Sequence, residues 1–279
     1  GFEDDFVPKG ATFTGKRKRA RSTMLRVANC LLGEDLGDDT LIIGTSGRYE
    51  FKNKGIDVFL ESLNRLNRDK DLKKKVLAFV NVPSWVGDPR EDLQKRLKSK
   101  DKFTEPLQCP FITHWLHNMT HDQVLDMLKY LGMGNRPEDK VKVIFVPCYQ
   151  DGHDGILNKH YYDLILGEDL SVYPSYYEPW GYTPLESVAF RVPTITTDLA
   201  GFGLWVNSLK NQHGINDGVE VLHRSDYNYS EVADGIKDTV ALFSTKTEAE
   251  IKEIRKRAGQ VAEQALWKHF IQYYYEAYD

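Results

Sequence analysis

The sequence predicts a doubly wound, Rossmann-like α/β fold, in which a parallel sheet is covered by helices on both faces. Short apolar runs, such as residues 41–47 (LIIGTSG) and 141–147 (VKVIFVP), alternate with stretches whose apolar residues recur at helical spacing. Strands that are buried on both faces read as continuous apolar segments, and parallel strands need helical connections between them. In such a sheet, ligands bind at the carboxyl ends of the strands.

The predicted elements follow one another along the chain. The first is a helix whose apolar face begins at Met24, and the basic run 16–21 (KRKRAR) is interpreted as its solvated end rather than as a polyanion patch. Strands are expected at residues 41–47, 75–82, 141–147, 170–174, 192–197 and 218–222. Helices are expected at residues 56–66, near 159–167 and from residue 184.

The chain of 279 residues, with 41% apolar residues, is long enough for one large domain with an appended helical segment. The sheet domain is predicted over residues 1–244, with a less regular insertion at 83–140, and the helical segment over 245–279. Within the insertion, the spacing of His114, His117 and His121 could ligate a metal. Because residues 120–123 (THDQ) read as a capping box that starts the next helix, no metal is predicted.

Composition argues against two classes of partner. No apolar run approaches the eighteen residues that a membrane span needs, and a net charge of −4 provides no general attraction to nucleic acid. The three cysteines, Cys30, Cys109 and Cys148, include no CxxC pair and are odd in number. This pattern favours reduced thiols over a disulfide framework, so we expect a cytoplasmic protein.

The most informative segment is residues 173–203, YPSYYEPWGYTPLESVAFRVPTITTDLAGFG. It places Glu178 and Glu186 eight residues apart, on either side of a glycine turn. Residues 183–186 (TPLE) read as a capping box with proline in the first helical position, so Thr183 is expected to start a helix and Glu186 to lie in its first turn. A strand end, a glycine loop and a helix N-terminus together suit a bound phosphate.

A structural alternative exists for this segment, in which GYTP is a simple turn and its aromatic residues only pack. A second loop favours the anion site. In residues 47–55 (GRYEFKNKG), Arg48, Lys52 and Lys54 lie between the first strand and its helix. Cations near a helix N-terminus are unfavourable by about 0.3–1 kcal/mol, so a bound anion is expected to offset that cost. Surface charge without a ligand is the alternative for this loop.

These residues resemble a known family. The spacing of Glu178 and Glu186 matches the Glu-x7-Glu signature of retaining nucleotide-sugar glycosyltransferases with two Rossmann-like domains (GT-B). The string PSYYEPWGYTP, with VPTITTDLAGFG after it and GRYEFKNKG and KVKVIFVP before it, resembles glycogen synthase of the animal and fungal type. The resemblance implies the C-terminal, donor-binding half of an enzyme that transfers glucose from UDP-glucose to the non-reducing end of an α-1,4-glucan (glycogen) with retention. It implies neither a metal nor another cofactor, and little or no transfer without the N-terminal acceptor domain.

The resemblance also implies roles for individual residues. Arg48 and Lys54 would contact the diphosphate and stabilise the leaving UDP, while Glu178 would lie near the transferred glucose. The remaining donor contacts would be Tyr161 with the uracil, Trp180 and Gly181 with the glucose hydroxyls, Tyr182 and Thr183 with the phosphates, and Glu186 with the ribose.

Three other functions are compatible with parts of the pattern. A related retaining transferase would use another donor, such as ADP-glucose, or another acceptor. A non-catalytic domain would only bind nucleotide or glucan, but it would not need Arg48, Lys54, Glu178 and Glu186 together. A nicotinamide oxidoreductase is disfavoured because GTSGR, after the first strand, lacks the G-x-G-x-x-G spacing that admits a pyrophosphate.

Overall fold

Six parallel strands form the central sheet of the computed structural model, which describes the backbone of residues 7–278 and the side chains of residues 7–267. The strand order is β5-β2-β1-β6-β7-β8. The strands are β1 (Leu41–Ser46), β2 (Val76–Asn81), β5 (Val141–Val146), β6 (Leu170–Val172), β7 (Thr194–Thr197) and β8 (Val219–Leu222). The predicted fold class is therefore confirmed, and all six strands lie within the predicted segments.

The strand order reverses between β1 and β6. From β1 the chain builds outward through β2 to β5, and it then returns to β6 and builds outward on the other side through β7 to β8. Ligands in doubly wound sheets bind at such a switch point, outside the carboxyl ends of the strands. The loops after β1 and β6 therefore meet at the edge of the sheet where the sequence predicts the site.

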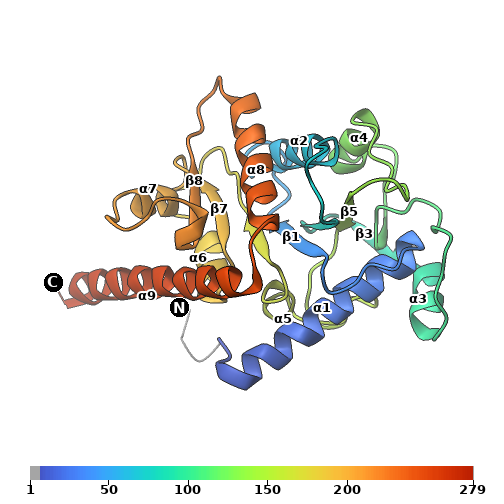
Figure 1. The fold of residues 1–279 in the computed structure, drawn as a ribbon, viewed down its shortest axis with the longest axis horizontal. Coiled ribbons are helices and arrows are strands. Elements are labelled where there is room, and N and C mark those ends of the chain that lie inside the picture. The colour runs from blue at the N-terminus through green and yellow to red at the C-terminus, as the bar shows by residue number, and fades with distance from the viewer. Residues whose placement is uncertain (1–6, 279) are drawn as a thin grey trace.

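Helices cover both faces of the sheet (Figure 1). Successive strand residues point to opposite faces, so Leu41 and Ile43 join one apolar core and Ile42 joins the other. The first core contains α2 (Ile56–Asn67), α4 (Gln123–Tyr130) and α8 (Tyr229–Ser244). The second contains α1 (Gly10–Leu32), α3 (Glu91–Lys98) and α5 (Tyr161–Ile165).

A third apolar cluster joins α6 (Tyr182–Ala189), α7 (Gly201–Asn207) and α9 (Glu248–Tyr278). The helical segment predicted from residue 245 is α9, which buries Ala258, Val261 and Ala262 in this cluster; residue 279 lies outside the described residues. The short helix η2 (Ile215–Asp217) also packs against α9. Among the described residues, no helix combines the length and apolarity needed to cross a bilayer.

The basic run 16–21 differs from its prediction. It lies inside α1, which already begins at Gly10, and not at the end of the helix. Arg17 Nη2 and Arg21 Nη1 bind the two carboxylate oxygens of Asp169 at 2.7 and 2.9 Å, and both guanidinium groups are largely buried. The interpretation as a solvated helix end is therefore wrong for Arg17 and Arg21, because a partner distant in the sequence pairs with them.

The predicted insertion contributes α3 and α4 to the two main cores and also forms a second, two-stranded sheet. Its strands β3 (Val86–Pro89) and β4 (His114–Leu116) pair in antiparallel fashion. The predicted capping box at 120–123 is wrong, because the N-cap of α4 is Asp122, whose Oδ2 accepts a hydrogen bond from Leu125 N–H at 2.9 Å. The Thr120 hydroxyl instead donates to Asn118 Oδ1.

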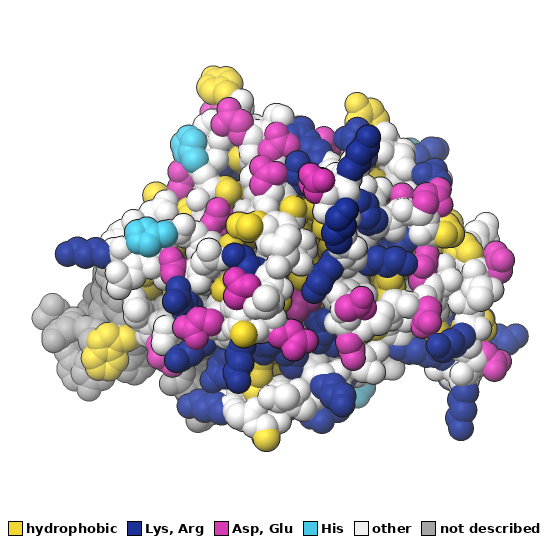
Figure 2. Space-filling view, viewed as in Figure 1, with side chains coloured by type: hydrophobic (Ala, Val, Ile, Leu, Met, Phe, Trp, Pro, Cys, Tyr) yellow, Lys and Arg dark blue, Asp and Glu magenta, His cyan; other side chains and the backbone are white. Residues whose placement is uncertain are grey.

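Charged side chains of both signs are interspersed over the face seen in Figure 2, and no large apolar area interrupts them. Cys30, Cys109 and Cys148 are free thiols, as predicted.

Candidate functional site

The loops after β1 and β6 meet at the switch point. Lys54 Nζ, from the first loop, forms an ion pair and a hydrogen bond with Glu178 Oε1, from the second. The side chains of Lys54 and Glu178 are only 19% and 15% exposed. Tyr176 N–H also donates to Asn53 O at 2.7 Å, so the backbones of the two loops are joined as well. The structure thus brings together two of the residues that the sequence predicts for one site.

The close approach of the two loops depends on Gly55. Its φ is 71°, in the left-handed region, and a Cβ there would clash with the carbonyl oxygen of Pro174. Only glycine allows both that conformation and that contact without strain. Gly55 is the N-cap of α2, so the same residue begins the helix and admits the second loop.

The loop that carries Glu178 is also held from its other side, by the segment after β7. Gly201 N–H donates to Glu178 O at 3.0 Å, and Phe202 N–H donates to Trp180 O at 2.6 Å. The Trp180 ring packs edge-on against Phe202, with ring centroids 6.0 Å apart. A Cβ on Gly201 would clash with the carbonyl oxygen of Pro179, which explains the glycine there.

The start of α6 differs from the predicted capping box. The helix begins at Tyr182, its N-cap is Gly181 with a φ of 101°, and no side chain caps it. Thr183 therefore lies inside the first turn and does not start the helix, while Glu186 lies in the second turn rather than the first. Because no side chain occupies the N-terminus of α6, its first backbone N–H groups are available to an anion.

Glu186 faces a tyrosine on α5. Tyr162 O–H donates to Glu186 Oε1 at 3.2 Å, and its ring stacks on Phe190 at 5.3 Å between centroids. Burial raises the pKa of the Glu186 carboxyl above its ordinary value, and the hydrogen bond from Tyr162 partly opposes that shift. Glu186 is therefore a half-buried carboxylate beside an aromatic ring.

Tyr161, the residue predicted to contact a base, directs its hydroxyl inward. Its OH shares a hydrogen bond with Ser46 Oγ at 2.7 Å and lies 3.5 Å from the Tyr173 hydroxyl. Burial raises the pKa of the Tyr161 phenol well above its ordinary value. The structure thus places Tyr162, and not Tyr161, against Glu186; the role of Tyr161 stays a prediction.

Arg48 and Tyr182 are the exposed members of the predicted site. Arg48 is exposed and forms no hydrogen bond or ion pair with any side chain in the described part of the chain. Tyr182 is also exposed, so it does not fit the alternative in which the aromatic residues of this turn only pack. Trp180 does pack, as that alternative expects.

Two residues of this region were missed by sequence reasoning. Arg224, just after β8, reaches across the sheet edge, where its Nη1 donates to Pro174 O and its guanidinium lies 5.3 Å from the centre of the Tyr176 ring. Glu168, just before β6, is buried beneath the site and accepts a hydrogen bond from Ser171 Oγ. No local motif marks either residue, because their partners are determined by the order of the strands.

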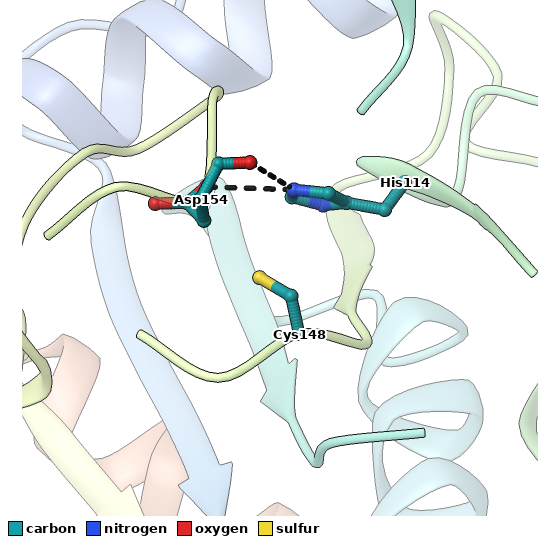
Figure 3. A group of neighbouring side chains, drawn as sticks. All are labelled: His114, Cys148 and Asp154. Atoms are coloured by element: carbon teal, nitrogen blue, oxygen red, sulfur yellow. Dashed lines mark hydrogen bonds and ion pairs between the residues drawn. The ribbon is translucent and has the colours of Figure 1, made fainter. Parts of the chain in front are cut away.

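The three histidines of the insertion do not form one cluster. His114 is buried on β4, whereas His117 stacks against the exposed Trp85 ring at 4.3 Å between centroids. Figure 3 shows His114 instead beside Cys148 and Asp154. The potential ligand atoms of these three residues lie within 4.8 Å of one another.

Hydrogen bonds already engage this group. His114 Nε2 donates to Asp154 O at 2.8 Å, and its Nδ1 lies 2.8 Å from Thr113 Oγ1. The Asp154 carboxylate accepts three backbone N–H groups at 2.7–3.1 Å, from Ile156, Leu157 and Asn158. Burial lowers the pKa of His114 and raises that of the Cys148 thiol to about 12. His114 Nε2 and both oxygens of the Asp154 carboxylate are thus already engaged in hydrogen bonds, so this group acts as an anchor between β4 and the loop after β5.

Comparisons with known proteins identify relatives. A family model described as glycogen synthase matches residues 31–88 and 89–279. The chain is 28% identical over 296 aligned residues to the glycogen [starch] synthase of Neurospora crassa, with 86% of this chain and 41% of that protein covered. It is 32% identical over 239 residues to the glycogen [starch] synthase of Caenorhabditis elegans, with 67% and 35% covered. The chain thus spans about two fifths of the length of the curated relatives that it matches.

The fold is similar to that of WaaG, a glycosyltransferase involved in lipopolysaccharide biosynthesis. The TM-score is 0.50 at 13% sequence identity, with 94% of this chain and 50% of that chain covered. At this identity the likeness concerns the fold alone.

Proposed function

The chain belongs to the glycogen synthase family, and from that premise we propose that it is the donor-binding half of a retaining hexosyltransferase. The whole enzyme would transfer glucose from UDP-glucose to the non-reducing end of an α-1,4-glucan. The observation that carries this proposal is the contact between Lys54 and Glu178 at the switch point of the sheet. It joins a cation suited to a diphosphate and a carboxylate suited to a sugar within one site.

The diphosphate would lie between the loop after β1 and the N-terminus of α6. Arg48 and Lys54 would stabilise the negative charge that develops on UDP as the glycosidic bond breaks. Uncapped N–H groups at Tyr182 and Thr183 would add the positive end of the helix dipole. Because Arg48 and Lys54 supply positive charge next to the diphosphate, we propose that the reaction needs no metal or other cofactor.

The two carboxylates would serve different parts of the donor. Glu178 would lie near the transferred glucose, whose transition state has oxocarbenium character. Glu186 would accept hydrogen bonds from the ribose hydroxyls, and its half-buried position beside Tyr162 supports a contact with the nucleoside. Tyr161, Trp180 and Gly181 are proposed to complete the donor contacts.

The acceptor would need a second domain. The coverage of 41% of the N. crassa relative supports a longer enzyme, and we propose that an N-terminal domain closes over this edge of the sheet. On its own, the 279-residue chain is expected to bind the nucleotide but to transfer little glucose. Free thiols support a cytoplasmic location, which we also propose.

Calorimetric titration of the folded chain with UDP, and in parallel with ADP, tests this proposal. We expect saturable binding of UDP that exceeds the binding of ADP and falls at least tenfold in Glu186→Gln. Glu220→Gln is the matched control, because Glu220 is also a half-buried glutamate with a raised pKa but lies on β8. Stronger binding of ADP would change the donor, and equal loss in both variants would remove Glu186 from the site.

A further inference from the structure

The loop between β1 and α2 is anchored to two different parts of the fold. Towards its end, Asn53 O and Lys54 Nζ contact the loop that carries Glu178. Near its start, Tyr49 contacts the N-terminus of α4, which packs beside α2 (Figure 1). The second anchor therefore joins the loop to the predicted insertion, a segment that carries none of the predicted donor contacts.

The Tyr49 hydroxyl makes two hydrogen bonds at the start of α4. It donates to Asp122 Oδ1 at 2.7 Å and accepts from Val124 N–H at 3.0 Å. The other carboxylate oxygen, Asp122 Oδ2, accepts Leu125 N–H at 2.9 Å and so caps the helix. One carboxylate thus serves the helix with one oxygen and the tyrosine with the other. Tyr49 in turn satisfies a backbone N–H that the start of a helix leaves without an intrahelical partner.

This contact is buried. Asp122 is 6% exposed, and the Tyr49 ring packs edge-on against Phe145 of β5, with ring centroids 5.9 Å apart. Burial and, after it, the hydrogen bond to Asp122 raise the pKa of the Tyr49 phenol above its ordinary value, so the phenol keeps the proton that it donates. A hydrogen bond to a charged acceptor is stronger than one between neutral groups. A packed ring and two hydrogen bonds together hold Tyr49 in one position.

The backbone of Arg48 depends on Tyr49, because the residue on its other side does not fix it. Gly47 has a φ of 137°, and a Cβ there would meet nothing closer than the Lys54 side chain at 3.9 Å. Glu50 N–H donates to Arg48 O at 2.8 Å, and Lys54 N–H donates to Glu50 O at 2.8 Å. The loop is therefore folded on itself, and a displacement of Tyr49 would move Arg48 with it.

The side chain of Arg48 has no anchor of its own. It is exposed, and within residues 7–267 its guanidinium pairs with no other side chain. The position of its backbone therefore decides which volume the guanidinium can reach. A binding group whose starting point is already fixed loses less conformational freedom when its ligand arrives, and this preorganisation strengthens binding.

We propose that Tyr49 is a positioning residue for Arg48 and that Asp122, in the insertion, holds Tyr49 in place. The insertion would thereby strengthen donor binding without touching the donor. This inference rests on the proposed function, which assigns Arg48 to the diphosphate. Without the anchor, the loop would be free to move, and the diphosphate would have to order it on binding.

Calorimetric titration of the 279-residue chain with UDP tests the positioning role. Tyr49→Phe keeps the ring and removes the hydroxyl, and it should weaken UDP binding by about three- to tenfold. Asp122→Ser keeps a residue that caps helices well but lacks the oxygen that accepts from Tyr49, and it should cause the same loss. Tyr130→Phe is the matched control, because Tyr130 lies at the other end of α4 and is 87% exposed. Circular dichroism confirms that each variant is folded.

A comparison in the Arg48→Ala background separates positioning from a general loosening of the fold. Arg48→Ala alone should weaken UDP binding. Tyr49→Phe should then add less than about twofold to that loss, because no guanidinium remains to be positioned. A merely structural role of Tyr49 predicts the same loss in both backgrounds, and that result would overturn the proposal.

The outcomes also separate this inference from the proposed function. If UDP does not bind, or if Arg48→Ala leaves its affinity unchanged, both are wrong, because Tyr49 would have no donor contact to position. If Arg48→Ala weakens binding but Tyr49→Phe and Asp122→Ser do not, only the positioning role is wrong. Weaker binding in all three variants, with no further loss when Tyr49→Phe is added to Arg48→Ala, supports both.

Discussion

Lys54 and Glu178 are separated by more than 120 residues of sequence, yet they form an ion pair across the switch point of the sheet. Both side chains are largely buried, so each charge is compensated mainly by the other. A diphosphate that enters the site would give Lys54 a second anion to bind. The contribution of Lys54 to the affinity for UDP is therefore the first property to measure.

Replacement of Lys54 by alanine is expected to weaken UDP binding by about 10- to 100-fold, because a hydrogen bond to a charged group contributes about 1.5–3 kcal/mol. Lys52→Ala is the control, since Lys52 is an exposed cation of the same loop. Calorimetry on both variants measures the difference. Equal affinities would mean that Lys54 does not touch the nucleotide.

Substitution of Gly55 should destabilise the fold more than substitution of another glycine with the same backbone angle. Gly55 and Gly132 have φ values of 71° and 70°, but only at Gly55 would a Cβ clash with another loop. Gly132→Ala should cost about 1–2 kcal/mol from the left-handed conformation alone. Gly55→Ala should lower the free energy of unfolding by clearly more. Urea unfolding of both variants measures the two losses, and equal losses would contradict this account.

Loss of the Asp169 carboxylate should be costly because it leaves two largely buried guanidinium groups without a negative charge, with only backbone carbonyls such as Leu166 O and Gly167 O to accept from them. We expect Asp169→Asn to lower the free energy of unfolding by about 3–5 kcal/mol, the range for breaking a buried pair. Asp163→Asn breaks the exposed pair with Lys16, at 3.4 Å, and should cost no more than about 1 kcal/mol. Denaturant titration compares the two, and a small loss in Asp169→Asn would show that the backbone carbonyls that already accept from Arg17 and Arg21 are sufficient.

Stability should fall as the pH rises toward 8, because burial raises the pKa of Glu168 to about 8 from 4.5. Between these values the folded state binds more protons than the unfolded state, so the free energy of unfolding decreases with pH, by up to about 1.4 kcal/mol per unit. Glu168→Gln keeps the shape and removes the titration. In urea unfolding, the free energy of unfolding of Glu168→Gln relative to that of the natural chain should increase from pH 6 to pH 8. A constant difference between the two chains would mean that Glu168 does not titrate in this pH range.

Local patterns in the sequence were sufficient for the fold class, and they indicate the sheet edge at which a site is expected. Continuous apolar runs that alternate with segments of helical periodicity predict a parallel sheet, because only strands covered on both faces can be apolar throughout. Once the sheet is parallel, the loops after the strands share one edge, whereas the assignment of Lys54 and Glu178 to one site came from the family resemblance. Both predicted capping boxes are wrong, because the N-caps are Gly181 and Asp122. The sequence does not show which of several neighbouring residues caps a helix.

Only the tertiary structure decided which distant groups meet. The pairing of Arg17 and Arg21 with Asp169, the reach of Arg224 to Pro174 and the burial of Glu168 all depend on strand order, which places residues far apart in the chain side by side. Periodicity describes the faces of one element but carries no information on its neighbours. The sequence by itself therefore determined the elements, the edge at which a ligand is expected and the family resemblance, whereas packing decided which charged groups pair and which polar groups are buried.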